Sequence, residues 1–246
     1  MARFFVLREH LRGEIATVTG QELDHMRKAL RLEPGDAVTL FDDEGWEHEG
    51  VIRSYTSHSG EIAILKSFQP ERESPLCVTL AQALGKGEKM DWVVEKATEL
   101  GVAAIAPFFS SRTVPKLDRA SAEKRQARWR KIALSAAKQS GRTRVPEILE
   151  ITDVSELAHK PWPCALKLLC WEGESQRTLA EVMQENPRVE SLLLLIGPEG
   201  GLSADEVAEA ARNGFQSVGL GKRILRTETA ALAALSLVQF LWGDMG

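Results

Sequence analysis

The first third of the chain alternates short apolar segments with turn-forming residues, which is typical of a small β-rich domain. The apolar segments are rich in β-branched residues, and turns such as Pro34-Gly35-Asp36 separate them. One helix is expected after Thr19, because Thr19 and Glu22 have the spacing of a capping box and apolar residues follow at helical intervals. A small β-barrel over residues 1–70 is therefore predicted, with strands at Phe4–Leu7, Ala37–Phe41, Gly50–Tyr55 and Glu61–Phe68.

Beyond a polar, proline-containing segment at residues 69–75, apolar strand patterns alternate with helical ones. Two of the strand patterns are apolar without alternation, as expected of strands buried on both faces. Ser203 and Glu206 form a second capping box, and Thr227 is expected to cap the last helix. An α/β domain with a mostly parallel sheet is predicted over residues 76–246. Its strands are expected at Val78–Ala83, Ala103–Pro107, Ala165–Cys170, Leu192–Ile196 and Ser217–Leu220, and its helices at Met90–Leu100, Ser121–Gln139, Ala204–Asn213 and Glu228–Trp242.

The composition excludes several classes of protein. The chain has 246 residues, of which 43% are hydrophobic and 27% charged, as in ordinary globular proteins. No apolar run approaches the roughly 20 residues that span a bilayer, and the apolar stretch at the N-terminus is too short for a signal peptide. The three cysteines form neither an even disulfide framework nor a C-x-x-C pair, and the histidines are scattered. We expect a cytoplasmic protein without a metal site or a membrane span.

Charge is distributed unevenly along the sequence. The formal net charge is −4, but residues 112–144 contain eleven basic and two acidic residues, a local charge of +9. An ordinary solvated helix face would mix both signs, so this segment favours binding of a polyanion through its backbone phosphates. Smaller basic groups lie in the first region. The candidate RNA-binding residues are Arg3, Arg27, Arg31, Arg112, Lys116, Arg125, Arg128 and Arg142.

Two glycine-containing loops follow predicted strands near the C-terminus and carry the candidate chemistry. One is Gly197-Pro198-Glu199-Gly200-Gly201, and the other is Leu220-Gly221-Lys222-Arg223-Ile224-Leu225-Arg226-Thr227-Glu228. Ligands of open α/β sheets bind at the carboxyl ends of strands, where loops leave backbone amides free. The segment Cys170-Trp171-Glu172-Gly173-Glu174 ends another strand, so three strand ends are expected to converge on one pocket. Walker A, dinucleotide, zinc-protease and serine-hydrolase motifs are absent from the sequence.

These loops closely resemble those of the bacterial small-subunit (16S) ribosomal RNA uracil-N3 methyltransferases, which belong to the SPOUT class. The resemblance extends upstream to Gly85-Lys86-Gly87-Glu88-Lys89-Met90-Asp91, to Arg128-Trp129-Arg130-Lys131-Ile132 and to His25-Met26-Arg27-Lys28-Ala29-Leu30-Arg31. It covers essentially the whole chain. The resemblance implies a PUA-like barrel followed by a SPOUT methyltransferase domain with a C-terminal trefoil knot. It also implies S-adenosylmethionine as the methyl donor, a homodimer, and 16S rRNA or the small ribosomal subunit as the partner, with no DNA.

The resemblance and the chemistry of the residues together give candidate roles. A cation near the target base would favour the anion formed when uracil N3 loses its proton, and Arg226 is the leading candidate. Glu199 or Glu228 could accept that proton, and the sequence does not separate them. By the resemblance, the residues of the cofactor pocket are Leu195, Gly197, Gly200, Leu220, Gly221, Ile224, Leu225 and Thr227, with Glu172 as a weaker candidate.

Two other functions compete with a methyltransferase. A non-catalytic RNA-binding factor of ribosome assembly would bind RNA without taking up the cofactor, and the glycine loops argue against it. A small-molecule enzyme with a nucleotide-like ligand would explain the loops but would leave the +9 segment without a role.

Overall fold

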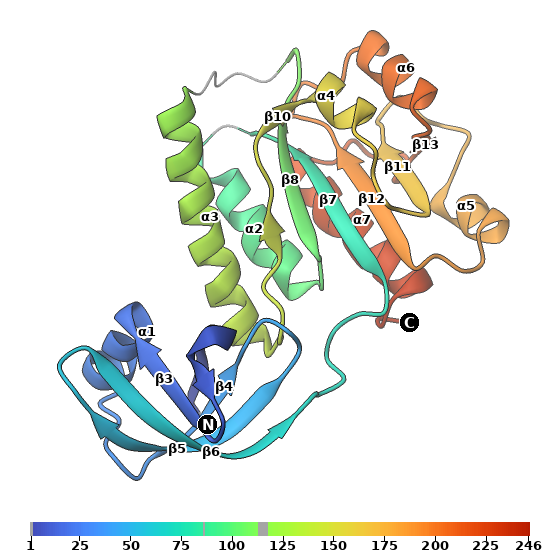
Figure 1. Ribbon diagram of the computed structural model, residues 1–246. Helices are drawn as coiled ribbons and strands as arrows, with labels where there is room; N and C mark the ends of the chain where they lie inside the picture. The colour runs from blue at the N-terminus through green and yellow to red at the C-terminus, as the bar shows by residue number, and fades with distance from the viewer. Residues whose placement is uncertain (1, 86, 113–117) are drawn as a thin grey trace. The chain divides into compact units, whose positions relative to one another are not determined.

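The computed structural model describes residues 2–85, 87–112 and 118–246, which form two compact units (Figure 1). Unit 1 comprises Met1–Glu73 together with Ala137–Val145, and unit 2 comprises Ser74–Ala136 together with Pro146–Gly246. The chain therefore returns to unit 1 after entering unit 2, which local sequence patterns did not predict. Lys116, a predicted RNA-binding residue, lies outside the described residues.

Unit 1 is built on a six-stranded mixed sheet with the order β1-β4-β5-β6-β3-β2. Strands β1 and β4 are parallel, and the other neighbours are antiparallel. Its core contains Phe4, Met26, Leu40, Ile52 and Ile62, all at most 1% exposed. The elements are β1 (Ala2–Phe5), a 3-10 turn (Arg8–His10), β2 (Leu11–Arg12), β3 (Ile15–Thr19), α1 (Gly20–Asp24), a π-helical turn (His25–Ala29), β4 (Ala37–Phe41), β5 (Glu47–Tyr55) and β6 (Ser59–Phe68).

The predicted capping box of α1 is wrong, although the helix does begin after Thr19. The Thr19 side chain makes no capping hydrogen bond. The carboxylate of Glu22 instead accepts the backbone amide of Phe5 at 3.3 Å and pairs with Lys138 Nζ at 2.8 Å. Side-chain exposure is 16% for both Glu22 and Lys138. A partly buried ion pair with a distant residue therefore replaces the local cap, which sequence spacing alone could not reveal.

Unit 2 is α/β with a wholly parallel sheet in the order β10-β8-β7-β12-β11-β13, and β9 also pairs with β8. The predicted alternation of strands and helices is confirmed, and four further short elements lie between Glu147 and Glu185. The elements are β7 (Cys77–Ala83), α2 (Lys89–Glu99), β8 (Ala104–Phe109), α3 (Arg119–Ser140), β9 (Glu147–Ile148), β10 (Thr152–Asp153), α4 (Val154–His159), β11 (Leu166–Cys170), α5 (Leu179–Glu185), β12 (Ser191–Ile196), α6 (Ala204–Arg212), β13 (Gln216–Val218) and α7 (Thr227–Trp242).

Helices pack on the sheet of unit 2 (Figure 1). Helix α7 contacts β7, β12 and α2, while α4 contacts β8 and α6. One core cluster joins the sheet residues Phe108, Leu169, Leu193 and Leu195 to residues of α4 and α6. The predicted Ser203–Glu206 capping box at the start of α6 is confirmed. The loops after β11, β12 and β13 leave the sheet at the carboxyl ends of these strands.

Candidate functional site

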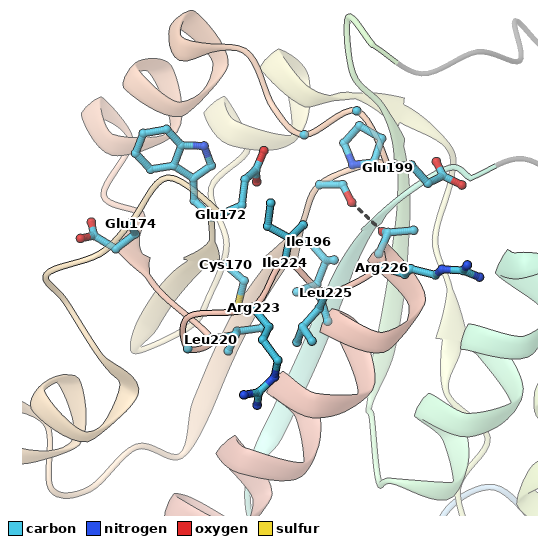
Figure 2. Close-up of a pocket in the computed structure, with 18 of the residues that line it drawn as sticks. Cys170, Glu172, Glu174, Ile196, Glu199, Leu220, Arg223, Ile224, Leu225 and Arg226 are labelled. Atoms are coloured by element: carbon cyan, nitrogen blue, oxygen red, sulfur yellow. Dashed lines mark hydrogen bonds between the residues drawn. The ribbon is translucent and has the colours of Figure 1, made fainter.

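A cavity of about 430 Å³ lies at the carboxyl ends of β11, β12 and β13 (Figure 2). Its volume is in the range of small-molecule sites. Three loops form it, as predicted from the three strand ends. The lining residues are Cys170, Trp171, Glu172, Glu174, Ile196, Gly197, Pro198, Glu199, Gly200, Gly201, Leu220, Gly221, Lys222, Arg223, Ile224, Leu225, Arg226, Thr227 and Ala230.

The structure brings eight of the nine predicted cofactor-binding residues together in this lining. These are Glu172, Gly197, Gly200, Leu220, Gly221, Ile224, Leu225 and Thr227.

Leu195 is the exception, because it is not among the residues that line the cavity. It is fully buried in the cluster that β12 shares with α4 and α6, whereas its neighbour Ile196 lines the cavity. Successive side chains of a strand point to opposite faces, so only one of the two can face the site. The apolar run gave no alternation from which to choose between them.

A chain of two hydrogen bonds, one buried and one partly buried, joins the segments around the cavity. Gln82 Nε2 donates to Thr227 Oγ1 at 2.9 Å, and Thr227 Oγ1 donates to the carbonyl of Gly197 at 2.6 Å. The bond from Thr227 to Gly197 is drawn in Figure 2. The N-cap of α7 is Arg226, so the predicted capping role of Thr227 was wrong. Its hydroxyl instead ties the start of α7 to the ends of β7 and β12.

The loop at residues 220–226 presents both backbone donors and apolar side chains. No hydrogen bond found within the described residues uses a backbone amide of this loop. Gly221 has φ +96°, a conformation that favours glycine, and a Cβ there would meet no atom within 4 Å. Ile224 and Leu225 lie between the charged ends of the cavity in Figure 2, and Ile224 is 86% exposed. Such a surface can sandwich a flat heterocycle while free amides bind its edge.

The loop after β11 contributes two carboxylates. Glu172 packs so closely over Gly201 that a Cβ on Gly201 would clash with Glu172 Oε1. Glu174 accepts hydrogen bonds from Ser217 Oγ and from the backbone amides of Gln176 and Arg177. These bonds, that from Ser217 first, lower the pKa of Glu174 to about 2. The loop thus keeps a negative charge at the side of the cavity opposite Arg226 (Figure 2).

Two of the three predicted catalytic residues line the cavity, and the third does not. Arg226 and Glu199 line the cavity and lie on the same side of it in Figure 2. Glu228 lies in the first turn of α7 and is not among the lining residues. Lys89 was not predicted, but its Nζ lies 2.9 Å from Glu199 Oε1 and 3.3 Å from Glu228 Oε2. Lys89 stands in the Gly85–Asp91 motif, but its position in the sequence did not indicate that it pairs with Glu199 and Glu228.

The predicted RNA-binding residues fall into exposed and internally paired groups. Arg27, Arg31 and Arg112 are exposed, and Arg125 is partly exposed. Arg112 Nη1 donates to the carbonyl of Gly200 at 2.8 Å, which places it beside the cavity. Arg128 is exposed but pairs with Glu88 and Asp91.

Two predicted RNA-binding residues are engaged within unit 1. Arg3 pairs with the buried Glu47 at 2.6 Å, and Arg142 pairs with Glu73 at 2.7 Å. Their side chains are 13% and 7% exposed. A guanidinium that is both paired and buried is a poor ligand for a phosphate, so the contacts of Arg3 and Arg142 indicate a structural role.

Neither a metal site nor a membrane-spanning helix is found in the described part of the chain. No group of three or more His, Cys, Asp or Glu side chains there could hold a metal ion. None of the helices described is long and apolar enough to cross a bilayer.

Comparison with known proteins identifies the family. Residues 72–239, more than half of the chain, match the RNA methyltransferase domain. The small-subunit ribosomal RNA methyltransferase E of Bacillus subtilis is 34% identical over 91% of this chain and 89% of its own length. The corresponding Neisseria gonorrhoeae structure, bound to S-adenosylmethionine, has a TM-score of 0.90 with 36% identity over 100% of both chains. A putative methyltransferase from Legionella pneumophila with bound S-adenosylmethionine also has a TM-score of 0.90, with 33% identity over 99% of this chain and 98% of its own. The chain therefore belongs to the family of ribosomal RNA small subunit methyltransferases E.

Proposed function

We propose that this protein transfers the methyl group of S-adenosylmethionine to N3 of a uridine in 16S ribosomal RNA. The observation that carries the proposal is the cavity formed by the loops after β11, β12 and β13. It combines apolar side chains, free loop amides and a volume of about 430 Å³, next to Arg226 and Glu199. Family membership and the relatives that bind S-adenosylmethionine support the same function.

The residues of the cavity fit the proposed cofactor. Ile196, Ile224 and Leu225 provide apolar faces for an adenine ring, and the amides of the loop at residues 220–226 can bind its polar edge. Glu172 and Glu174 can bind positively charged groups. When bound, S-adenosylmethionine supplies a methyl carbon that is electrophilic because it is attached to a sulfonium.

The protein must therefore prepare the nucleophile. Uracil N3 carries a proton at neutral pH, and its loss places negative charge on the flanking carbonyl oxygens. The guanidinium of Arg226, on the cavity wall, favours that anion. A carboxylate accepts the proton, and Glu199 lines the cavity whereas Glu228 does not. Holding the base and the methyl group in line supplies further acceleration.

In each unit, exposed basic residues are the proposed contacts to RNA. Arg27 and Arg31 belong to unit 1, which we take to be a PUA-like RNA-binding barrel. Arg112 and Arg125 belong to unit 2, and Arg112 lies against the glycine loop of the cavity. Contacts to phosphates give affinity without base recognition and weaken with salt. An rRNA substrate would place the enzyme in the cytoplasm.

The finer architecture that the resemblance implies is also part of the proposal. We take unit 2 as a SPOUT domain whose C-terminal segment forms a trefoil knot. The bonds from Gln82 through Thr227 to Gly197 support this, because they hold the last loop against the ends of earlier strands. We further propose a homodimer. Trp92 on α2 and Leu237 and Phe240 on α7 are 44%, 43% and 60% exposed, and the two helices pack together.

The test is transfer of a tritiated methyl group to small ribosomal subunits and to naked rRNA, followed by nucleoside analysis. The expected product is N3-methyluridine, formed with one or both substrates. Arg226→Ala is the matched control, which should bind the cofactor but transfer slowly. Cofactor binding without transfer to any rRNA substrate would contradict the enzymatic proposal and favour a non-catalytic RNA-binding factor of ribosome assembly.

A further inference from the structure

We propose that Lys89 is a positioning residue for methyl transfer, anchored by Glu228 and holding Glu199 in place to accept the N3 proton. The inference rests on the proposed function. It assigns different roles to the two glutamates and adds a third residue to the site.

The geometry joins three separate segments through one ammonium group. Lys89 is the first residue of α2, Glu199 lies in the loop after β12, and Glu228 lies in the first turn of α7. Lys89 Nζ is 2.9 Å from Glu199 Oε1 and 3.3 Å from Glu228 Oε2. The contact with Glu199, followed by that with Glu228, raises the pKa of Lys89. The lysine is therefore a fixed positive charge between two carboxylates.

The two carboxylates have different surroundings. Glu199 lines the cavity and its side chain is 35% exposed, so a substrate at the rim can reach it. Glu228 does not line the cavity, and its side chain is 16% exposed. Its Oε2 is buried and lies at ion-pair distance from Lys89, with no hydrogen-bond geometry to any described residue. Glu228 therefore serves to hold the lysine, and Glu199 is the carboxylate that can meet the target base.

The surroundings of Lys89 keep this arrangement in place. Asp91, in the same turn, pairs with Arg128 and accepts the indole N–H of the buried Trp129 at 2.9 Å, which fixes the start of α2 against α3. Gly85 leaves room for the ion pair, because a Cβ there would lie 3.1 Å from Glu199 Oε1 and 3.6 Å from Lys89 Cβ.

The ion pair between Lys89 and Glu199 contributes to the reaction by fixing the position of the carboxylate. When the base reacts, the N3–H bond breaks, its proton passes to a carboxylate oxygen of Glu199, and the electron pair remains on N3. A neighbouring ammonium makes a carboxylate less basic, so the lysine does not strengthen the acceptor. It restricts the direction in which Glu199 points, and a misplacement of about 1 Å can cost about 10²-fold in rate.

The test compares Lys89→Met, which removes the charge, with Lys89→Arg, which retains it. Lys96→Met is a matched control, because Lys96 is on the same helix, is 33% exposed compared with 32% for Lys89, and also bridges two glutamates. Methyl transfer and cofactor affinity are measured for each. Lys89→Met should lower kcat at least tenfold while changing the cofactor Kd less than threefold. Lys89→Arg should recover most of the loss, and Lys96→Met should behave as the wild type.

A double-mutant cycle separates positioning from a general structural effect. If Lys89 acts through Glu199, Lys89→Met should lower kcat little further in a Glu199→Gln background. With Arg226→Ala, which acts separately, the two losses should multiply. Multiplied losses with Glu199→Gln, or a normal kcat for Lys89→Met, would overturn the inference.

A spectroscopic measurement tests the anchor without using activity. The ¹³Cε signal of Lys89, assigned by its loss in Lys89→Arg, should titrate with a pKa above that of an ordinary lysine. Glu228→Gln should move this pKa back toward the ordinary value, and an unchanged pKa would remove Glu228 as the anchor. If the wild type transfers no methyl group, the proposed function fails, whereas the titration still decides whether the ion pairs exist.

Discussion

The hydroxyl of Thr227 offers a sharp test of how the cavity is held together. Thr227 is 6% exposed, and its Oγ1 donates to Gly197 and accepts from Gln82. Thr227→Val keeps the shape of the side chain but removes both bonds. It leaves the Gly197 carbonyl without this donor, while Gln82 Nε2 keeps its bond to the carbonyl of Ala83. The expected loss in the free energy of unfolding is about 2 kcal/mol, since the partly buried Gly197 carbonyl loses its donor and the bond from Gln82 to Thr227 is also lost.

Thr227→Ser is the matched variant, because it keeps the hydroxyl and loses only a buried methyl group, worth about 0.8 kcal/mol. Urea unfolding at constant m-value measures both variants, and isothermal titration measures their affinity for S-adenosylmethionine. The Val variant should be less stable than the Ser variant by about 1–2 kcal/mol. Its cofactor Kd should rise at least tenfold, because the loops after β12 and before α7 are no longer joined. Equal stability of the two variants would refute the role assigned to the hydroxyl.

Four further predictions concern the cofactor, the reaction, RNA and pH. Gly221→Val should weaken cofactor binding at least tenfold in titration calorimetry, while Gly214→Ala, also at positive φ with open space around it, should not. Arg226→Ala should lower kcat at least tenfold with less than a threefold change in cofactor Kd, and equal losses in both would exclude a transition-state role. Arg125→Glu should weaken RNA binding and reduce the slope of affinity against salt by about one to two, measured by filter binding. The folded-state pKa of Glu174 is about 2, below the ordinary 4.5, so its stabilisation is present above pH 4.5 and is lost as pH falls toward 2. An acid-unfolding curve of Glu174→Gln should therefore lack this component.

Much of the architecture follows from local patterns. Apolar runs without alternation predicted the buried parallel strands β11 and β12, and the Ser203–Glu206 spacing predicted the start of α6. Gly101 and Gly214 follow their helices with φ +81° and +87°, as expected of residues at helix ends. These features depend on contacts within a few residues, so the sequence contains the information that determines them.

Contacts between distant residues were not predicted, and they account for the errors. The choice between Leu195 and Ile196 depended on which face of β12 meets α4 and α6. Thr19 and Thr227 had the sequence position of helix caps, but Glu22 pairs with Lys138 and Thr227 binds Gly197. In both cases a partner more than 25 residues away replaced the local bond.

The sequence by itself determined the alternation of strands and helices, the positions of the glycine loops, the local +9 charge and, by resemblance, the family. Only the tertiary structure decided which residues of these loops face one cavity and which basic side chains remain available to RNA. Arg3 and Arg142 count as charges in the sequence but are engaged by Glu47 and Glu73 in the folded chain. The role proposed for Lys89 depends on its contacts with Glu199 and Glu228, which lie on two other segments of the chain. The reason is physical: propensity and capping act over one turn or strand, whereas ion pairs and cavities depend on the packing of the whole domain.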